Sequence, residues 1–371
     1  MTDFAPTSAE EIADIVKAAA ANREPLEILG NATKRVIGRP VTAPHRLSTT
    51  KLTGVTLYEP EELVLSAKAG TPLSEIETLL AKHNQQLAFE PPHWGEQTIG
   101  GVIATGFSGP RRIQAGAVRD HLLGFSAVNG RGELFKAGGR VVKNVTGYDL
   151  SKLMAGSFGT LAVLTDITLK VLPRPEAQAT LVRTNQSARD GIALLNKALG
   201  QPYEITAAAW LPDFNGTSIT ALRLEGFTDS VADRAASLCR QFDLAIADTE
   251  HFWDGIRDAS LLEPQPALWR ISVPPNRGGD ILAAFPHAKA ITDWGGGLIW
   301  LNLNDDNATQ LRAEVAKTGG HATLVSASEA TRSTIDVFQP QTGALAALTA
   351  RVKDSFDPHR ILNPGRMYAS L

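Results

Sequence analysis

The sequence predicts an α+β protein with two domains and a distinct C-terminal segment. Its 371 residues exceed what one hydrophobic core usually serves. Up to Pro173, strand and helix patterns alternate with glycines between them, whereas the later sequence has few clustered glycines. Two prolines as close as Pro173 and Pro175 break any regular element. We therefore expect a first domain over residues 1–175, a second over 176–340, and a closing segment over 341–371.

The first elements are a helix and a strand. Ser8-Ala9-Glu10-Glu11 matches a capping box, and the apolar residues after it recur at helical spacing through Ala19. Leu26–Leu29 is predicted as a short strand. It leads into Gly30–Gly38, a polar loop bounded by glycines that is too long for a simple turn.

Later elements continue the alternation. Leu63–Ala69 is predicted as a strand, after which Thr71 and Pro72 cap and start a helix that reaches His83. Leu161–Leu172 is the last long strand of the first domain. In the rest of the chain we expect a turn at Trp294–Gly297, a strand at Leu298–Leu303 and a helix at Leu345–Phe356.

Composition narrows the class of protein. The formal net charge of −3 and a pI near 6.3 argue against a polyanionic partner such as nucleic acid. The single cysteine, Cys239, excludes an internal disulfide and any thiolate-based iron–sulfur site within this chain. The N-terminal residues lack a signal-peptide pattern, and no run of eighteen apolar residues occurs. We expect a cytoplasmic protein that touches a membrane only through partners.

Glycines concentrate in one stretch. Residues 95–159 hold fourteen of the 32 glycines. Glycine adopts positive φ and lets the main chain approach a ligand, and successive N–H groups at a turn or helix start form a concavity for phosphate. This stretch therefore predicts an anionic group held by backbone.

Two segments carry that prediction. Gly30–Gly38 joins a strand end to a threonine hydroxyl and two cations, although alone it could equally be an ordinary surface loop. Thr98-Ile99-Gly100-Gly101 precedes an apolar helical run, so free N–H groups at the helix start could meet the same ligand. Two such loops suit a dinucleotide. The absence of G-x-G-x-x-G and of a Gly-Lys-Ser/Thr motif disfavours a nicotinamide Rossmann domain or an NTPase.

These segments resemble the FAD-binding domain of the vanillyl-alcohol-oxidase, or PCMH-type, flavoprotein superfamily, and more narrowly the FAD-binding E subunits of bacterial glycolate oxidases. The most specific match is Lys143-Asn144-Val145-Thr146-Gly147-Tyr148-Asp149. The matching segments are Gly30–Lys34, Thr98–Gly109, Gly116–Asp120, Gly139–Leu150, Leu153–Leu161 and Ile361–Gly365.

The resemblance implies a two-subdomain FAD-binding domain, an α+β cap domain and a C-terminal segment that packs back on the FAD domain. It implies that the FAD diphosphate is wrapped by Gly30, Asn31, Ala32, Thr33 and Lys34, opposite Thr98, Gly100, Gly101, Thr105 and Gly106. By the same resemblance, Gly159 and Val163 contact FAD through backbone, and Asn363 lies near the isoalloxazine edge. The alternative for Asn363-Pro364-Gly365 is a plain turn.

The resemblance also implies how the flavin is attached. Covalent members of the superfamily place a histidine in the first loop, and this loop has none. Cys239, on the amphipathic stretch Val231–Phe242, is interpreted as a buried small hydrophobe. We expect non-covalent FAD.

Residues for substrate chemistry are harder to assign. Oxidising a 2-hydroxy acid at a flavin needs a cation for the carboxylate and a base or metal for the hydroxyl proton. Close relatives carry a metal-binding histidine cluster, but His251, His287 and His321 are far apart here, so we expect no metal and leave the catalytic residues unknown. Trp94 could stack on the flavin or anchor its loop. The available cations are Arg111, Arg112, Arg119, Arg270 and Arg366.

The resemblance implies an FAD-binding subunit of a heteromeric glycolate oxidase or dehydrogenase. Glycolate, or D-lactate, would be oxidised to the 2-oxo acid, with electrons passed to an iron–sulfur subunit. The other partner would be a catalytic FAD-containing subunit, and the complex would be cytoplasmic or peripheral at the inner membrane. Two alternatives remain open: a self-sufficient FAD-dependent 2-hydroxy-acid dehydrogenase, and a flavin-free structural subunit of the complex.

Overall fold

The computed structural model describes residues 2–140, 147–248, 251–262, 266–304 and 307–371, and the chain forms two compact units. The first unit comprises Met1–Phe107, Gly116–Pro173 and Pro340–Leu371, and the second comprises Ser108–Ala115 and Arg174–Gln339. The sequence analysis had placed boundaries after residues 175 and 340. It had not separated Ser108–Ala115, which lies inside the predicted first domain.

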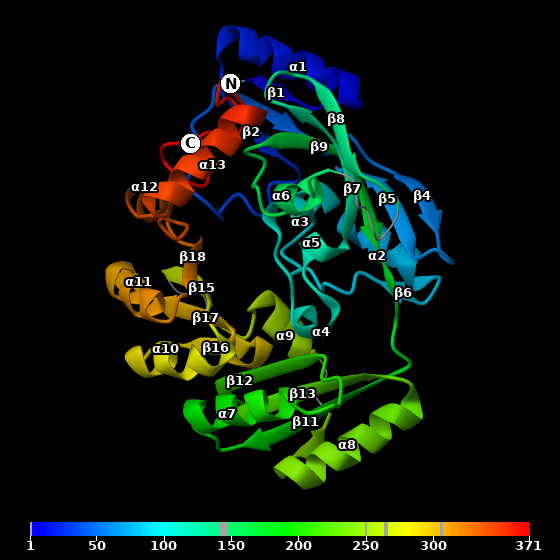
Figure 1. Cartoon of the computed structure of the whole chain (residues 1–371), viewed down its shortest axis with the longest axis vertical. Coiled ribbons are helices and arrows are strands. Elements are labelled where there is room, and N and C mark those ends of the chain that lie inside the picture. Colours follow the sequence, from blue (N-terminus) through cyan, green and yellow to red (C-terminus); the bar gives the residue numbers. More distant parts are fainter. Residues whose placement is uncertain (1, 141–146, 249–250, 263–265, 305–306) are drawn as a thin grey trace. The chain divides into compact units, whose positions relative to one another are not determined.

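The first unit contains two main sheets (Figure 1), which gives the α+β class predicted from the sequence. The smaller sheet is parallel, in the order β1 (Thr2–Phe4), β3 (His45–Ser48) and β2 (Leu26–Leu29). The larger is antiparallel, in the order β4 (Val55–Glu59), β5 (Val64–Lys68), β9 (Ala162–Lys170), β7 (Leu122–Asn129) and β8 (Leu134–Gly138). A short pair joins β6 (Gln85–Gln86) to β10 (Leu172–Pro173).

Six helices of the first unit are described. They are α1 (Ala9–Asn22), α2 (Leu73–Ala81), α3 (Ile99–Thr105), α5 (Val118–His121), α6 (Leu150–Met154) and α13 (Gly343–Phe356). Helix α1 begins as predicted, because the Ser8 hydroxyl accepts the Glu11 N–H at 3.1 Å. The Glu11 carboxylate accepts the Thr7 N–H at 2.7 Å, which satisfies a second donor at this end.

Helix α2 begins differently from the prediction. Thr71 does not cap it, because its hydroxyl donates to the Lys68 carbonyl at 2.7 Å and accepts the Gly54 N–H at 3.0 Å. Pro72 takes the cap position instead. The Thr71 side chain therefore stabilises the turn after β5, and the predicted role at the helix is wrong.

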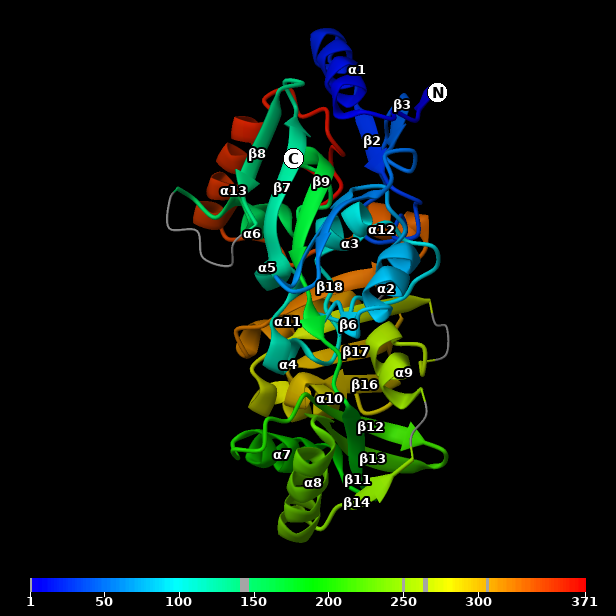
Figure 2. The same ribbon diagram turned by 90° about the vertical axis from the view of Figure 1, so that its right-hand side faces the viewer.

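Two apolar clusters hold the first unit together. One lies between the larger sheet and the helices α2 and α3. The other joins α1 and β2 to Ile361 and Leu362 of the C-terminal segment, both buried. The end of helix α13 meets β8, where the rings of Phe356 and Phe135 are 5.8 Å apart between centroids (Figure 2). The C-terminal residues are thus part of the core of this unit.

The second unit is built on one sheet of eight strands. Their order is β14 (Ala245–Ala247), β11 (Ala177–Thr184), β13 (Thr217–Gly226), β12 (Ala207–Phe214), β16 (Ala290–Asp293), β17 (Leu298–Leu303), β15 (Ala267–Ser272) and β18 (His321–Ser326). The predicted turn before Leu298 contains a short 3-10 segment, Trp294–Gly296, in which Gly295 is left-handed with a φ of +68°.

Helices α7 and α8 pack on β11–β13, and α11 packs on β18. The helices of this unit are α4 (Arg112–Ala115), α7 (Ala188–Leu199), α8 (Thr228–Phe242), α9 (Phe252–Asp258), α10 (Gly278–Ala284), α11 (Ala308–Lys317) and α12 (Glu329–Thr334), with a 3-10 turn at Pro275–Arg277. Among the described residues of both units, we find no helix with the length and apolar character needed to cross a bilayer.

Candidate functional site

A cavity in the first unit collects most of the residues proposed from the sequence. It lies between the loop after β2, helix α3, the start of β9 and the C-terminal segment, and encloses about 860 Å³ including the part open to solvent. Twelve of the thirteen proposed residues line it: Gly30, Asn31, Ala32, Thr33, Lys34, Thr98, Gly100, Gly101, Thr105, Gly159, Val163 and Asn363. Segments far apart in sequence therefore form one site.

Gly106 is the proposed residue that does not line this cavity. It ends α3 with a φ of +69°, and a Cβ there would lie 3.1 Å from the Cα of Gly156. Its glycine is explained by this close approach of two backbones.

The backbone donors of the loop after β2 belong to residues that line the cavity. In the part of the chain that the structure describes, the N–H groups of residues 30–34 have no recorded acceptor. Ala32 has a φ of +59°, a left-handed conformation that helps successive N–H groups converge. Gly30, Thr33 and Lys34 are buried or partly buried, whereas Asn31 and Ala32 are exposed. Buried or partly buried backbone donors rarely stay without a partner, so this run of N–H groups favours a ligand with acceptor oxygens.

Side chains fix this loop through contacts that do not involve those donors. Asn31 Nδ2 donates to the Glu96 carbonyl at 2.7 Å. At the other end, Arg35 pairs with buried Glu27 through Nε–Oε1 at 2.6 Å and Nη2–Oε2 at 2.9 Å. Arg366 Nη2 donates to the Lys34 carbonyl at 3.0 Å. The loop is therefore held in shape before any ligand arrives.

Lys34 places a buried cation at the same wall. The residue is 8% exposed, and its Nζ donates to Oε1 of buried Gln97, whose Nε2 donates to the Pro92 carbonyl at 2.6 Å. No carboxylate is recorded at this Nζ among the described residues. Burial lowers the pKa of Lys34 to about 8. A cation surrounded by neutral groups favours an anionic ligand.

The start of α3 differs from the prediction. Its first N–H groups are already used, because Ile99 donates to the Thr71 carbonyl at 2.9 Å and Gly100 to the Ala69 carbonyl at 2.8 Å. The Gly101 N–H donates to the Thr98 hydroxyl, which caps the helix, at 3.2 Å. The expectation of free N–H groups at this helix start is wrong, since the helix packs end-on against the β5–α2 connection.

Protein packing also explains two of the glycines. A Cβ at Gly100 would lie 2.7 Å from the Ala69 carbonyl oxygen, and a Cβ at Gly30 would collide with the Thr98 hydroxyl. These glycines let chain segments touch each other. Their presence alone is therefore no measure of ligand binding.

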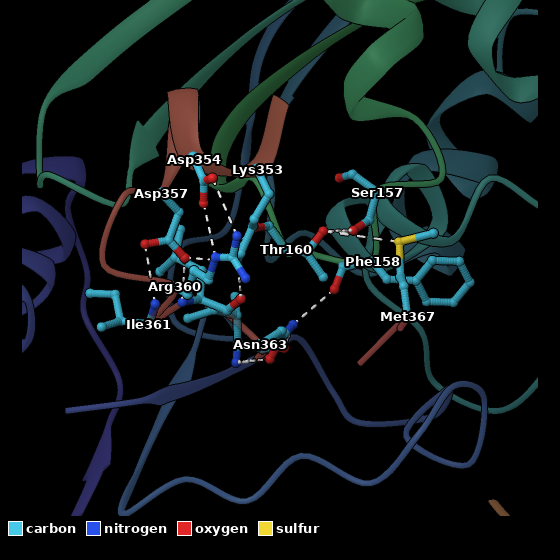
Figure 3. Close-up of polar contacts among 12 residues, drawn as sticks. Ser157, Phe158, Thr160, Lys353, Asp354, Asp357, Arg360, Ile361, Asn363 and Met367 are labelled. Atoms are coloured by element: carbon cyan, nitrogen blue, oxygen red, sulfur yellow. Dashed lines mark hydrogen bonds and ion pairs between the residues drawn. The ribbon is translucent and has the colours of Figure 1, made fainter. Parts of the chain in front are cut away.

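Asn363 joins two walls of the cavity (Figure 3). Its Oδ1 accepts the Ile28 N–H at 2.7 Å, and its Nδ2 donates to the carbonyls of Ile28 at 3.1 Å and Phe158 at 2.8 Å. Gly159 has a φ of +68°, and a Cβ there would lie 2.9 Å from Asn363 Nδ2. Asn363 thus fixes the backbone of both walls through its side chain, a more specific role than that of a plain turn.

The remaining candidate residues lie elsewhere. Trp94 is half-buried outside the cavity lining and meets Phe107 edge-on at 5.3 Å, which favours the role of loop anchor. Cys239 is half-buried on α8, so the expectation that it is buried is wrong, and partial burial raises the pKa of its thiol. Residues 143–146 lie outside the described residues. Asp149 caps α6 by accepting the Lys152 N–H at 3.3 Å.

The candidate arginines separate into groups. Arg111 pairs with Glu225 in the second unit, through Nε–Oε2 at 2.9 Å. Arg112 and Arg270 lie over the Trp294 ring at 4.3 and 5.1 Å, and burial together with Arg112 lowers the pKa of Arg270 to about 10. Arg119 is exposed, and Arg366 lines the cavity of the first unit.

His251, His287 and His321 are exposed, and no group of three potential metal ligands occurs in the described part of the chain.

Sequence reasoning missed several residues of the site. Phe158 lies within the matching segment Leu153–Leu161 but was assigned no role, Gln97 stands beside a proposed residue, and Glu27 lies inside a strand. Arg366 was one cation among several. Their roles come from contacts across long sequence separations, for which a single sequence carries no signal.

Comparisons with known proteins agree with the fold. Residues 3–138 match the family described as "FAD binding domain". The glycolate oxidase subunit GlcE of Escherichia coli (strain K12) is 38% identical over 360 residues, which cover 96% of each chain. A D-lactate dehydrogenase of Anaerostipes hadrus is 27% identical over 97% of this chain and 88% of the relative.

A solved structure shares the fold at low identity. Alkyldihydroxyacetonephosphate synthase superposes with a TM-score of 0.70 and 16% identity, over 98% of this chain and 75% of the other. The chain therefore belongs to the vanillyl-alcohol-oxidase, or PCMH-type, superfamily of FAD-dependent oxidoreductases, together with the Escherichia coli glycolate oxidase subunit, and its cofactor is FAD.

Proposed function

We propose that this chain is the FAD-binding subunit of a heteromeric glycolate oxidase or dehydrogenase. Glycolate, with D-lactate as the other candidate, is oxidised to the 2-oxo acid, and the electrons pass to a separate iron–sulfur subunit. Support comes from relatives named as glycolate oxidase subunits in Escherichia coli and Bacillus subtilis. The single cysteine of this chain fits a cluster carried by another subunit.

One observation carries the site assignment: among the described residues, the N–H groups of residues 30–34 have no acceptor, and this run ends at buried Lys34. This donor set fits the diphosphate of FAD, because it offers several backbone hydrogen bonds and one positive charge. The cofactor, when bound non-covalently here, supplies the acceptor for electrons from the substrate. The chain itself binds the diphosphate at residues 30–34 and fixes the wall at Phe158 and Gly159 through Asn363.

A second candidate is a self-sufficient FAD-dependent 2-hydroxy-acid dehydrogenase. The similarity to a D-lactate dehydrogenase over nearly the whole chain favours it. This activity needs a cation for the substrate carboxylate and a proton acceptor. Arg112 and Arg270 are available as cations, but no metal-binding group accompanies them in the described residues.

One purification distinguishes the candidates. The chain is purified alone, its visible absorbance is recorded, the chromophore is released by heat, and glycolate is added without oxygen. A releasable flavin that stays oxidised supports the dependent subunit, and bleaching shows the self-sufficient dehydrogenase. A chain that neither retains nor rebinds flavin contradicts both.

The heteromeric part of the proposal needs a second experiment. The native chain is captured from its own cells, and the co-purifying material is analysed for iron and flavin. We expect iron and more than one flavin per copy of this chain. Capture of the chain alone, with no iron, contradicts the proposed complex.

A further inference from the structure

A buried ion pair holds the C-terminal segment against the cavity. Lys353, on α13, is 2% exposed, and Asp357 just after the helix is fully buried. Lys353 Nζ lies 2.8 Å from Asp357 Oδ2 (Figure 3). Exchanging such a pair for uncharged residues of similar volume often leaves stability unchanged, whereas removing one partner is strongly destabilising. The effect of this ion pair on the position of the C-terminal segment therefore has to be tested separately from its effect on stability.

The Lys353 ammonium ties together two segments that meet at the cavity. It donates to the Thr160 carbonyl at 2.6 Å and to the Leu362 carbonyl at 2.9 Å. Thr160 directly follows Gly159 of one wall, and Leu362 directly precedes Asn363 of another. Each of the three ammonium protons therefore has an acceptor. Two of these acceptors, the Thr160 and Leu362 carbonyls, lie close in sequence to Phe158 and Asn363, which are joined by a hydrogen bond.

The Asp357 carboxylate fixes the same segment from the other side. It accepts the Ile361 N–H at 3.1 Å and the Leu362 N–H at 2.8 Å. The next residue, Asn363, donates its N–H to the Leu26 carbonyl at 3.0 Å, so the segment is hydrogen-bonded along the side of β2. A Cβ at Gly130 would collide with Asp357, which leaves the carboxylate little room to move.

We propose that Lys353 and Asp357 are positioning residues of the FAD site. They set the register of residues 361–363, and through Asn363 they fix the Ile28 and Phe158 walls that face the cofactor. This inference rests on the proposed FAD site. Because the coupling is reciprocal, FAD binding stabilises the docked C-terminal segment to the same extent that docking raises FAD affinity.

The first test uses the unmodified full chain. Amide hydrogen exchange is measured with FAD bound and after the flavin has been removed, with the amides of α2 as a reference. We expect the amides of Ile361, Leu362 and Asn363 to exchange about tenfold more slowly with FAD bound, beyond any change in α2. Unchanged exchange at residues 361–363 in a chain that binds FAD overturns the coupling and leaves the FAD assignment intact. A chain that does not bind FAD overturns both.

The second test compares two ion pairs of one segment. Lys353→Met with Asp357→Asn removes the buried charges together, so neither charge is left alone. Asp354→Asn with Arg360→Gln removes an exposed pair whose Nε–Oδ1 distance is 2.9 Å. We expect the Kd for FAD to rise about tenfold in the first variant, with a shifted visible spectrum, and less than about twofold in the control. Equal affinities in two folded variants contradict the proposal; if the first variant does not fold, the exchange measurement decides.

Discussion

Two walls of one cavity differ in the hydrogen bonding of their backbone N–H groups, and the wall with the larger share of glycine is the one whose donors are already used. In residues 30–34, side chains hold the loop and the N–H groups have no recorded acceptor among the described residues. At Ile99–Gly101 each N–H already donates to a carbonyl or to the Thr98 hydroxyl. Glycine content therefore does not locate an anion site; the hydrogen-bond partners of each N–H do.

The largest expected effect is a loss of FAD affinity when the cation in the wall formed by residues 30–34 is removed. Lys34→Met removes the buried cation but keeps most of the side-chain volume. Hydrogen bonds to charged groups contribute about 1.5–3 kcal/mol, so FAD should bind about 10- to 100-fold more weakly. Lys82→Met, at an exposed lysine after α2, is the control. Titration of flavin-free protein with FAD measures both, and a change below about threefold in Lys34→Met argues against this wall as the diphosphate site.

A pH titration sharpens the same comparison. Burial lowers the pKa of Lys34 to about 8, so the ammonium loses its proton as the pH rises through this value. Only the protonated form attracts a diphosphate, and affinity must therefore fall towards alkaline pH. We expect the Kd for FAD to rise about tenfold between pH 7 and pH 9. The Lys34→Met variant should lack this dependence, and an equally steep profile in that variant would assign it to another group.

The wall at α3 should respond in stability, with little change in affinity. Thr98→Val keeps the shape of the side chain but removes the hydroxyl that accepts the Gly101 N–H. Loss of such a cap costs about 1 kcal/mol. Urea unfolding should show this decrease while FAD affinity changes less than about twofold. A loss of affinity without a loss of stability would mean that the Thr98 hydroxyl contacts the cofactor directly.

The smallest expected effect concerns Ala32. Its φ of +59° is unfavourable for any residue with a Cβ, and glycine would relieve the strain while increasing the entropy of the unfolded chain. Ala32→Gly should therefore change the free energy of unfolding by less than about 1 kcal/mol. Ala32→Val should be the more destabilised of the two, because a β-branched side chain tolerates positive φ poorly. Thermal unfolding of the two variants checks the order.

Local patterns predicted much of the fold. Strand β2 has the predicted bounds, α1 begins at its Ser8 cap, and α13 starts within two residues of the predicted helix at Leu345–Phe356. These elements depend on propensity, caps and periodicity, which neighbouring residues determine. The Thr71 cap failed because the hydroxyl found nearer partners in Lys68 and Gly54.

The site was only partly predictable. The residues of the loop after β2 could be proposed from the sequence. The hydrogen bonds from the first N–H groups of α3 to the Thr71 and Ala69 carbonyls could not, since they depend on how α3 packs against the end of β5. The Lys353–Asp357 pair looks like an ordinary helical i,i+4 pair in the sequence. Its contacts to Thr160 and Leu362 exist only once the chain returns to β2. Contacts between residues so far apart in the sequence can be identified only from the structure.

The central claim is that residues 30–34 hold the diphosphate with their N–H groups and the start of α3 does not. Titration of isotope-labelled, flavin-free protein with ADP isolates the diphosphate contact, and amide NMR reports each N–H separately. The account predicts large shifts for the amides of residues 30–34 and small ones for Ile99, Gly100 and Gly101. Large shifts at Ile99–Gly101, with residues 30–34 unmoved, would contradict it.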